Sequence, residues 1–448
     1  MENNKILETI FIKANIKLIS PISIGNAIED NTDNDLLTDS EGKIFIPGTS
    51  IAGAVRSYLD NIYKDKEILN KYMGYSNGDK GCQSSVYFYD AELIKEGKIT
   101  IRDGIALEEF LKVTKDTAKY NYEVAERDNV FSFKLELVIR KWNEECKDEF
   151  YNITKIVIKA IQEGKILLGS KTNRGLGKVR LDNLQALKFD FNRPEALKEY
   201  LDFSWDKDFS DNETVSFYEG NKVIDINSIE LNKDSLTKIQ VPLKVKDTLF
   251  IRNYLLSNDD VDAEQMNFDG KFIIPGTTWS GAFKHRMFII LYDLLNGDKP
   301  TRILNDLFGE KGDNKKQLGK QSRIIFEESI SNDVARFHEI RRTKIDRFTG
   351  GACDKGLFES RVAVGGNTEL NIWIKDAKEH EIALVLMCIY DILSGFLAIG
   401  GETSVGRGIL SSNEELEIKK EDIKINDIYL TDEISKLYMK ALKQLILR

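Results

Sequence analysis

Two stretches of the chain alternate apolar and polar residues, and they lie about 230 residues apart. In each stretch an apolar residue recurs at nearly every second position, which is the pattern of a strand with one face in the core. The first stretch has its apolar residues at Ile12, Ala14, Ile16, Leu18, Ile22 and Ile24. The second has them at Ile239, Val241, Leu243, Val245, Leu249 and Ile251. The pattern therefore predicts a half-buried strand at each place.

A short apolar run and a Pro-Gly turn follow each predicted strand. Residues 46–56 read Ile-Pro-Gly-Thr-Ser-Ile-Ala-Gly-Ala-Val-Arg, and residues 274–286 read Ile-Pro-Gly-Thr-Thr-Trp-Ser-Gly-Ala-Phe-Lys-His-Arg. Hydroxyl residues placed after such a turn are good helix N-caps. We therefore predict a helix after each turn, with N-caps at Thr49 or Ser50 and at Thr277 or Thr278.

Further segments repeat in the same order. Residues 83–88 match 321–326, and the Gly-rich residues 169–177 match 400–408. A helix with apolar spacing close to 3.6 precedes each Gly-rich segment, at 151–163 and 380–396. An ordered set of matches about 230 residues apart indicates a tandem domain duplication.

The succession of strand, helix, strands, helix and strand predicts an α+β fold, with two ferredoxin-like domains that carry insertions. A chain of 448 residues is long enough for two such domains. We place the first domain at 1–200, an acidic connector at 201–237 and the second domain at 238–448. The acidic residues between 195 and 234 are equally typical of an ordinary solvated surface.

Composition is that of a soluble globular protein, with 42% hydrophobic and 31% charged residues. No apolar run is long enough to cross a bilayer, and the first residues do not resemble a signal peptide. The four cysteines are scattered, with no Cys-x-x-Cys pair, which argues against a zinc site. We expect a cytoplasmic protein with no membrane partner.

The helix starts are candidate phosphate sites. The first N–H groups of a helix attract anions, and cations follow each predicted start. The net charge of −9 is unfavourable for nucleic-acid binding, but this charge is unevenly distributed. The residues of this candidate site are Thr49, Ser50, Arg56, Thr277, Thr278, Lys284 and Arg286. The alternative is a pair of amphipathic helices whose basic residues are simply solvated.

The Gly-rich segments are a second candidate site. Glycine permits positive φ and a close approach of the backbone to a ligand. Lys171 and Arg174 add positive charge to the first segment, and Arg407 adds it to the second. Neither segment fits the Walker A pattern or the dinucleotide-binding fingerprint. The alternative is a strained connection between a helix and a strand.

Residues 341–352 combine basic residues with an aromatic ring and a tight turn. Such a segment can hold RNA, because cations bind phosphates and a ring can contact bases. The candidate contacts are Arg341, Arg342, Arg347 and Phe348. A solvated basic loop is the alternative, and residues 113–120 of the first copy are a degenerate version of the segment.

Together these motifs resemble the RAMP superfamily, and specifically the backbone subunits of type III CRISPR effector complexes. The resemblance lies in the two Ile-Pro-Gly turns, in Asp346-Arg347-Phe348-Thr349-Gly350-Gly351-Ala352 and in the Gly-rich segments. A fusion of two such domains resembles the III-D-like variants. The resemblance implies RRM-like cores with thumb insertions that bind CRISPR RNA and a single-stranded target RNA. It also implies other CRISPR effector subunits as partners.

The resemblance further implies cleavage of target RNA by a loop aspartate and a divalent cation, Mg²⁺ or Mn²⁺. Asp33 takes the catalytic position in the first loop, and Asp39 lies nearby in the sequence. In the second loop, Asp260 or Asp262 takes the catalytic position. Asp33 and Asp260 would hold the metal ion. RNA supplies its own nucleophile, the 2′-OH, so a carboxylate needs only to hold the cation or to assist deprotonation. The first thumb departs from the family motif, which puts its grip on a duplex in doubt.

Two other functions fit the same residues. The chain could be a noncatalytic RNA-binding scaffold or cap subunit of the same complex. The duplicated surfaces could instead bind protein, as in an interaction scaffold.

Overall fold

The computed structural model shows two compact units in the chain. The first unit comprises Met1–Thr100, Tyr122–Thr172 and Leu176–Asp234. The second comprises Ile101–Asn121, Asn173–Gly175 and Ser235–Arg448. The domain boundaries given above stay predictions. The structure describes residues 4–25, 32–78, 80–107, 114–206, 217–219, 222–224, 231, 236–253, 261–295, 299–310, 312, 319–412, 417–420, 423–426, 440 and 443.

An antiparallel sheet in the order β10-β1-β9-β6-β2 forms the base of the first unit, and β5 also pairs with β9. The first strand ends at Leu18, earlier than the alternation suggested, because Pro21 follows and cannot donate to a ladder. The strands are β1 (Ile6–Leu18), β2 (Phe45–Ile46), β5 (Val86–Phe88), β6 (Ala91–Lys95), β9 (Val130–Arg140) and β10 (Val179–Asp190).

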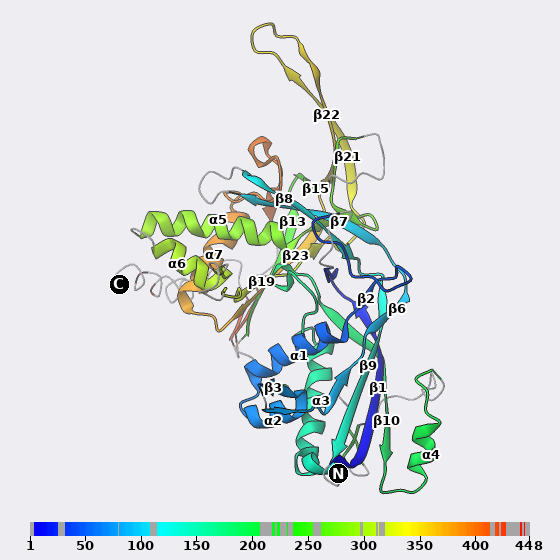
Figure 1. The fold of residues 1–448 in the computed structure, drawn as a ribbon. Coiled ribbons are helices and arrows are strands. Elements are labelled where there is room, and N and C mark those ends of the chain that lie inside the picture. The colour runs from blue at the N-terminus through cyan, green and yellow to red at the C-terminus, as the bar shows by residue number, and fades with distance from the viewer. Residues whose placement is uncertain are drawn as a thin grey trace. The chain divides into compact units, whose positions relative to one another are not determined.

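Helices α1 (Gly48–Ile62) and α3 (Lys147–Gln162) cover one face of this sheet (Figure 1). The predicted alternation of β1 is confirmed, because Ile12, Ala14 and Ile16 are buried against these helices. The polar residues between them therefore point to the opposite face of the sheet. Helix α2 (Lys66–Met73) and the small hairpin of β3 (Tyr75–Asn77) and β4 (Lys80–Cys82) follow α1.

In the second unit the main sheet has the order β19-β23-β13-β25-β26, and β24 also pairs with β13. Its helices are α5 (Gly276–Leu294), α6 (Lys299–Phe308) and α7 (Glu379–Leu393). Among the described residues of the whole chain, no helix is long and apolar enough to cross a membrane. The strands of this sheet are β13 (Leu236–Val245), β19 (Ile324–Phe326), β23 (Asn367–Lys375), β24 (Leu410–Ser411), β25 (Glu417–Lys420) and β26 (Ile423–Asn426). Smaller sheets contain β14 (Thr248–Leu249), β15 (Arg252–Asn253), β16 (Ala263–Gln265), β17 (Asn267–Phe268), β18 (Lys271–Ile274) and β20 (Ser329–Ile330).

The two main sheets share the arrangement of their central strands. In each, the opening strand lies between the strand before helix α3 or α7 and the strand or strands after that helix. Strand β1 lies between β9 and β10, and β13 lies between β23 and both β24 and β25. All of these pairings are antiparallel, as in a ferredoxin-like sheet. The predicted fold class is confirmed: the chain is α+β, with two tandem ferredoxin-like domains.

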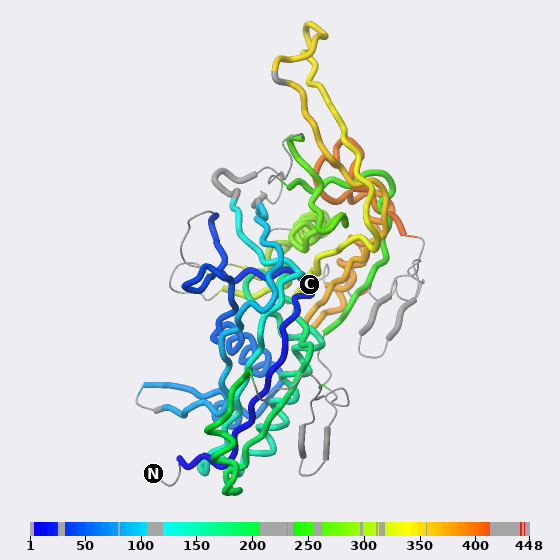
Figure 2. Tube along the Cα trace, turned by 90° about the vertical axis from the view of Figure 1, so that its right-hand side faces the viewer, coloured from blue at the N-terminus to red at the C-terminus, as the bar shows by residue number. Residues whose placement is uncertain are grey.

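Each copy also contributes a β-hairpin, which precedes β9 in the first copy and β23 in the second. The first hairpin consists of β7 (Ile99–Leu107) and β8 (Thr114–Ala125). From residue 101 to residue 121 it belongs to the second compact unit, where buried Arg102 forms an ion pair with buried Glu328. The second hairpin, here called the thumb hairpin, consists of β21 (Arg336–Ile345) and β22 (Ala352–Val364) and projects from its unit (Figure 2).

Helix α1 begins earlier than predicted. Its N-cap is Pro47, so Thr49 and Ser50 lie in the first turn and the predicted side-chain cap is wrong. The fixed φ of proline, with an extended ψ of 137°, leads directly into the helix at Gly48. The Gly48 N–H is satisfied instead by a distant carboxylate, since it donates to Asp90 Oδ1 at 2.7 Å.

Helix α5 begins in the same way. Its N-cap is Pro275, with φ −61° and ψ 147°, and no side chain caps the helix. Thr277 and Thr278 are therefore first-turn residues as well, and that predicted cap is also wrong. The backbone angles of the two prolines agree within 10°, so the Pro-Gly turn has a similar geometry in both copies.

Part of the predicted connector packs on the outer face of the first unit's sheet. After helix α4 (Ala196–Leu201), the ring of Phe203 stacks on Phe11 of β1 with 4.2 Å between centroids and an interplanar angle of 8°. Trp205 meets Phe11 edge-on at 5.1 Å, and its carbonyl accepts a hydrogen bond from Lys13 Nζ at 2.7 Å. Aromatic burial of this kind stabilises the covered end of the face. A short hairpin of β11 (Phe217–Glu219) and β12 (Lys222–Ile224) lies further along the connector.

Both Gly-rich loops, residues 169–177 and 400–408, close against the chain that follows the opening strand. In the first unit, Leu168 N–H donates to Gly177 O at 2.9 Å and Gly177 N–H donates to Pro21 O at 2.8 Å. In the second unit, Ile399 N–H donates to Gly408 O at 2.9 Å and Gly408 N–H donates to Thr248 O at 2.8 Å. A Cβ on either Gly177 or Gly408 would lie 1.9 Å from a carbonyl oxygen. Only glycine fits these two positions.

We predict that Gly408→Ala destabilises the second unit more than Gly406→Ala does. Both glycines have positive φ, which costs an L-residue about 1–2 kcal/mol, but a Cβ on Gly406 meets nothing within 4 Å. Forcing the backbone apart at Gly408 adds a further penalty of about 1–3 kcal/mol. Urea denaturation of both variants measures the difference, and equal free energies of unfolding would contradict the packing argument.

Candidate nucleic-acid interface

At the start of α1 one predicted cation has a structural partner. Thr49 is exposed and Ser50 half-buried, so both hydroxyls lie near the surface of the first turn. Arg56, two turns along the helix, donates through Nη2 to the carbonyl of Gly74, the residue that ends α2. Its guanidinium therefore caps the end of α2. A guanidinium has five N–H donors, so this one bond leaves others for a phosphate.

At the start of α5 the two predicted cations, Lys284 and Arg286, differ in their surroundings. Arg286 Nε donates to Asp391 Oδ2 of α7 at 2.6 Å, and this hydrogen bond raises the pKa of Arg286. Arg286 therefore joins α5 to α7. Lys284 is half-buried and lies seven residues after Thr277, so it shares the face of the helix on which that hydroxyl lies. Lys284 and the half-buried Thr277 and Thr278 are the better placed of the predicted contacts.

The first Gly-rich loop holds Lys171 in a left-handed conformation, with φ 54°. Its Nζ lies 3.7 Å from the centroid of the Tyr122 ring, a cation–π distance. In the second compact unit, Arg174 Nη1 donates to the Tyr120 hydroxyl at 3.0 Å. Both predicted cations are thus oriented by tyrosines of β8, and neither contact neutralises its charge.

The second Gly-rich loop carries a glutamate where the first has Lys171. Glu402 has φ 56°, so the backbone conformation is the same while the charge is reversed. Glu402 forms ion pairs with Arg342 of β21 and with Arg407, whose Nε lies 2.7 Å from Glu402 Oε2. Arg407 is buried, and its Nη1 has no hydrogen-bond partner in the part of the chain that the structure describes. The predicted contacts Arg342 and Arg407 are therefore both held by one carboxylate.

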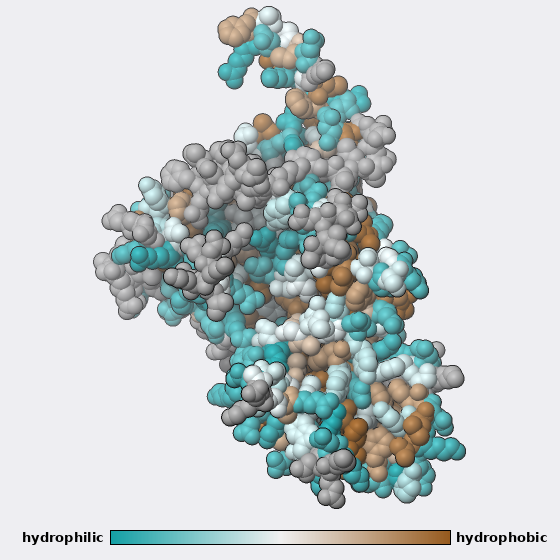
Figure 3. Space-filling view, in the orientation of Figure 1, coloured by the Kyte–Doolittle hydropathy of each residue, from teal (hydrophilic) through white to brown (hydrophobic). Residues whose placement is uncertain are grey.

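The tip of the thumb hairpin is an Asp-centred turn. Asp346 Oδ1 accepts hydrogen bonds from Phe348 N–H at 3.0 Å, Thr349 N–H at 2.8 Å and the Thr349 hydroxyl at 3.0 Å. This turn leaves Phe348 98% exposed, and apolar and hydrophilic side chains lie together at the tip (Figure 3). An exposed ring beside Arg347 is the arrangement expected of a contact for bases and phosphates.

At the base of the thumb hairpin, Arg341 is exposed and lies with its Nε 3.0 Å from Glu359 Oε1 on the neighbouring strand. Such an exposed pair is weak and is readily exchanged for another anion.

The first acidic loop contains three described aspartates in different surroundings. Asp35 is buried and accepts hydrogen bonds from Thr32 N–H and Oγ1 at 2.8 and 2.7 Å. Asp39 accepts from Glu41 N–H and Lys43 N–H at 2.8 and 2.9 Å, which shapes a turn. Asp33 is exposed. Asp33 therefore lies at the surface, where a ligand can reach it.

In the second acidic loop, Asp260 lies outside the described residues. Asp262 is exposed, and its Oδ2 accepts a hydrogen bond from Glu359 N–H at 2.9 Å. Its own N–H donates to Glu359 O at 3.0 Å, so Asp262 fastens the loop to β22. Within the described part of the chain, no three Asp, Glu, His or Cys side chains are grouped as a metal site.

Comparison with known proteins agrees with this geometry. A model of the RAMP superfamily matches residues 15–180 and 243–411, which is well over half of the chain and one match in each copy.

The chain belongs to the RAMP superfamily.

Two curated relatives of this superfamily member carry the name CRISPR system Cms endoribonuclease Csm3. The chain is 25% identical to that of Methanocaldococcus jannaschii over 223 residues, covering 42% of this chain and 84% of the relative. It is 26% identical to that of Streptococcus thermophilus over 159 residues, covering 32% of this chain and 70% of the relative. Each match therefore spans less than half of this chain and most of the relative.

Several residues of this RAMP protein's candidate site were missed from the sequence. Glu402 could have been found, because the aligned Gly-rich loops place it opposite Lys171. The tyrosines under Lys171 and Arg174 could not, because β8 is far from both in the sequence and carries no motif of its own.

Acid should disrupt the turn at the thumb tip. The Thr349 N–H and hydroxyl and the Phe348 N–H hold the pKa of the Asp346 carboxyl below its ordinary value of about 3.9. The turn thus favours the charged carboxylate. Its hydrogen bonds are fully formed above the ordinary pKa and are lost as the pH falls through the lowered pKa of Asp346. NMR of the Thr349 amide should show a transition below about pH 3.9 that is absent in Asp346→Asn. A midpoint at or above the ordinary value would contradict the assigned bonds.

Proposed function

We propose that the protein is a fused backbone subunit of a type III CRISPR effector complex of the III-D-like kind. It binds CRISPR RNA along both domains and cleaves target RNA that is paired to this guide. The observation that carries the proposal is the thumb hairpin, which presents exposed Arg347 and Phe348 from a tandem RAMP chain. The similarity to two proteins named as CRISPR endoribonucleases supports it.

RNA binding rests on cations of the first Gly-rich loop and of the start of α5. Lys171 and Arg174 lie against tyrosines, and Lys284 shares a face with Thr277 at the start of α5. Such groups bind phosphates without reading sequence, so base pairing with the guide selects the target. Arg286 contributes less, because its charge is paired with the Asp391 carboxylate.

Cleavage rests on Asp33 in the first domain and on Asp260 in the second. Mg²⁺ or Mn²⁺ fits a single carboxylate when RNA phosphates and water complete its shell, and such a cation would stabilise charge that develops on the phosphate. Asp33 would hold the cation or take the proton of the attacking 2′-OH. The 2′-oxygen bonds to phosphorus and the 5′-oxygen leaves with a proton. The products are a 2′,3′-cyclic phosphate and a 5′-hydroxyl.

A noncatalytic scaffold is the second candidate function for the second domain. Asp262 is committed to the Glu359 backbone, so it fastens the loop rather than offering a free carboxylate. If Asp260 does not act, the second domain only binds RNA.

Asp33→Asn should reduce one cut in guide-paired RNA by at least about 100-fold, because a positioned acid–base or metal-binding group is lost. Asp260→Asn should remove a second cut independently, and RNA affinity should be kept in both variants. Asp39→Asn is the matched control and should cut normally, since that carboxylate only shapes a turn. Gel analysis of end-labelled target RNA, with and without chelator, measures each cut. Normal cleavage by Asp33→Asn would reject Asp33.

Glu402→Gln should strengthen RNA binding. The ion pairs of Glu402 occupy Arg342 and Arg407, and removing its charge releases the partly exposed Arg342 for a phosphate. One added phosphate contact should steepen the salt dependence of binding by about 0.7 in log–log slope. Glu379→Gln makes the same charge change at an exposed position of α7 and serves as the control. If both variants bind alike, Glu402 does not compete with RNA.

A further inference from the structure

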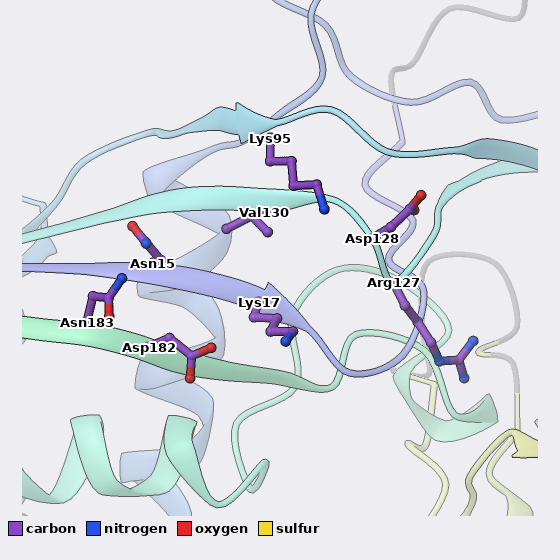
Figure 4. A pocket seen from close by; sticks show the side chains of 8 residues that line it. All are labelled: Asn15, Lys17, Lys95, Arg127, Asp128, Val130, Asp182 and Asn183. Atoms are coloured by element: carbon purple, nitrogen blue, oxygen red, sulfur yellow. The ribbon is translucent and has the colours of Figure 1, made fainter. Parts of the chain in front are cut away.

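The outer face of the first unit's sheet contains a pocket of about 430 Å³ (Figure 4). It lies at the end of the sheet where Lys17 of β1 pairs in register with Val130 of β9 and Arg180 of β10. The aromatic rings of the connector stack on Phe11, six residues earlier in β1. The connector therefore covers Phe11, while the end of the face near Lys17 stays open.

Three cations line this pocket. Lys17 and Lys95 are exposed, and neither forms an ion pair with any carboxylate among the residues that the structure describes. Arg127 is fixed by a hydrogen bond from its Nε to Ile19 O at 2.9 Å, and its Nη1 lies 3.9 Å from Glu126 Oε2 in a loose ion pair. Lysines without partners on one face are available to an anion that enters the pocket.

The two carboxylates of the pocket already have partners. Asp182 Oδ1 lies 3.0 Å from Arg180 Nε, and Asp128 Oδ1 accepts a hydrogen bond from Lys98 N–H at 3.0 Å. Their charge is therefore partly satisfied from outside the pocket. Asn15 and Asn183 add amides, which can donate to and accept from a sugar or a base.

The pocket is connected through the backbone to the first Gly-rich loop. Ile19, whose carbonyl holds Arg127, donates its own N–H to Lys178 O at 2.8 Å. Lys178 directly follows that loop, and Val179 begins β10. A strand bound at the loop therefore has a short path to the pocket.

We propose that this pocket binds the phosphodiester backbone of single-stranded RNA, as a contact separate from the helix starts, loops and thumb. Lys17, Lys95 and Arg127 receive the phosphates, and the amides meet ribose or base groups. No aromatic ring lines the pocket, so binding there is independent of base identity. The inference rests on the proposed function in one respect, that the protein binds RNA.

Single-stranded RNA binding of the full chain tests the proposal through the double variant Lys17→Ala/Lys95→Ala. Two lost phosphate contacts should weaken binding and flatten the log–log salt dependence by about 1.4. Lys17→Arg/Lys95→Arg should bind like the parent, because the charges are kept. Lys198→Ala removes an exposed lysine of α4 outside the pocket and should also bind like the parent.

The outcomes separate the two proposals. A parent protein that binds no RNA would overturn the proposed function, and the pocket proposal with it. A parent that binds RNA, with an alanine variant of equal affinity and slope, would overturn the pocket alone. A native thermal unfolding transition in the variant shows that a loss of affinity is not a loss of fold.

Discussion

Close backbone packing beneath the Gly-rich loops is the constraint on which the rest of each domain depends. Gly177 and Gly408 lie so near a carbonyl that no side chain fits, and both bond to the chain that follows the opening strand. This contact fixes the loop against the end of the sheet. The residues that the loop presents, Lys171 or Glu402, are therefore held at equivalent places in the two copies.

The two copies have the same backbone conformation at this loop position but side chains of opposite charge. Lys171 lies over the Tyr122 ring, whereas Glu402 forms ion pairs with two arginines of its own unit. The second hairpin has an Asp-centred tip that exposes a ring. The duplicated fold thus presents unlike residues at equivalent loop positions.

Local patterns in the sequence predicted the elements that local physics determines. Alternation predicted β1 and β13, and the Pro-Gly turns predicted α1 and α5, because periodicity and proline geometry act within a few residues. The caps were wrong because the turn already supplies the helix entry. Partners such as Gly74 for Arg56 and Asp391 for Arg286 depend on packing between distant segments, which no local pattern contains.

The nucleic acid bound to the protein, purified with its native partners, tests the central claim most directly. Extraction, sizing and nuclease treatment should yield an RNase-sensitive RNA of discrete length that carries CRISPR repeat and spacer sequence. An intact assembly that contains no RNA, or RNA of random length and sequence, would contradict the account.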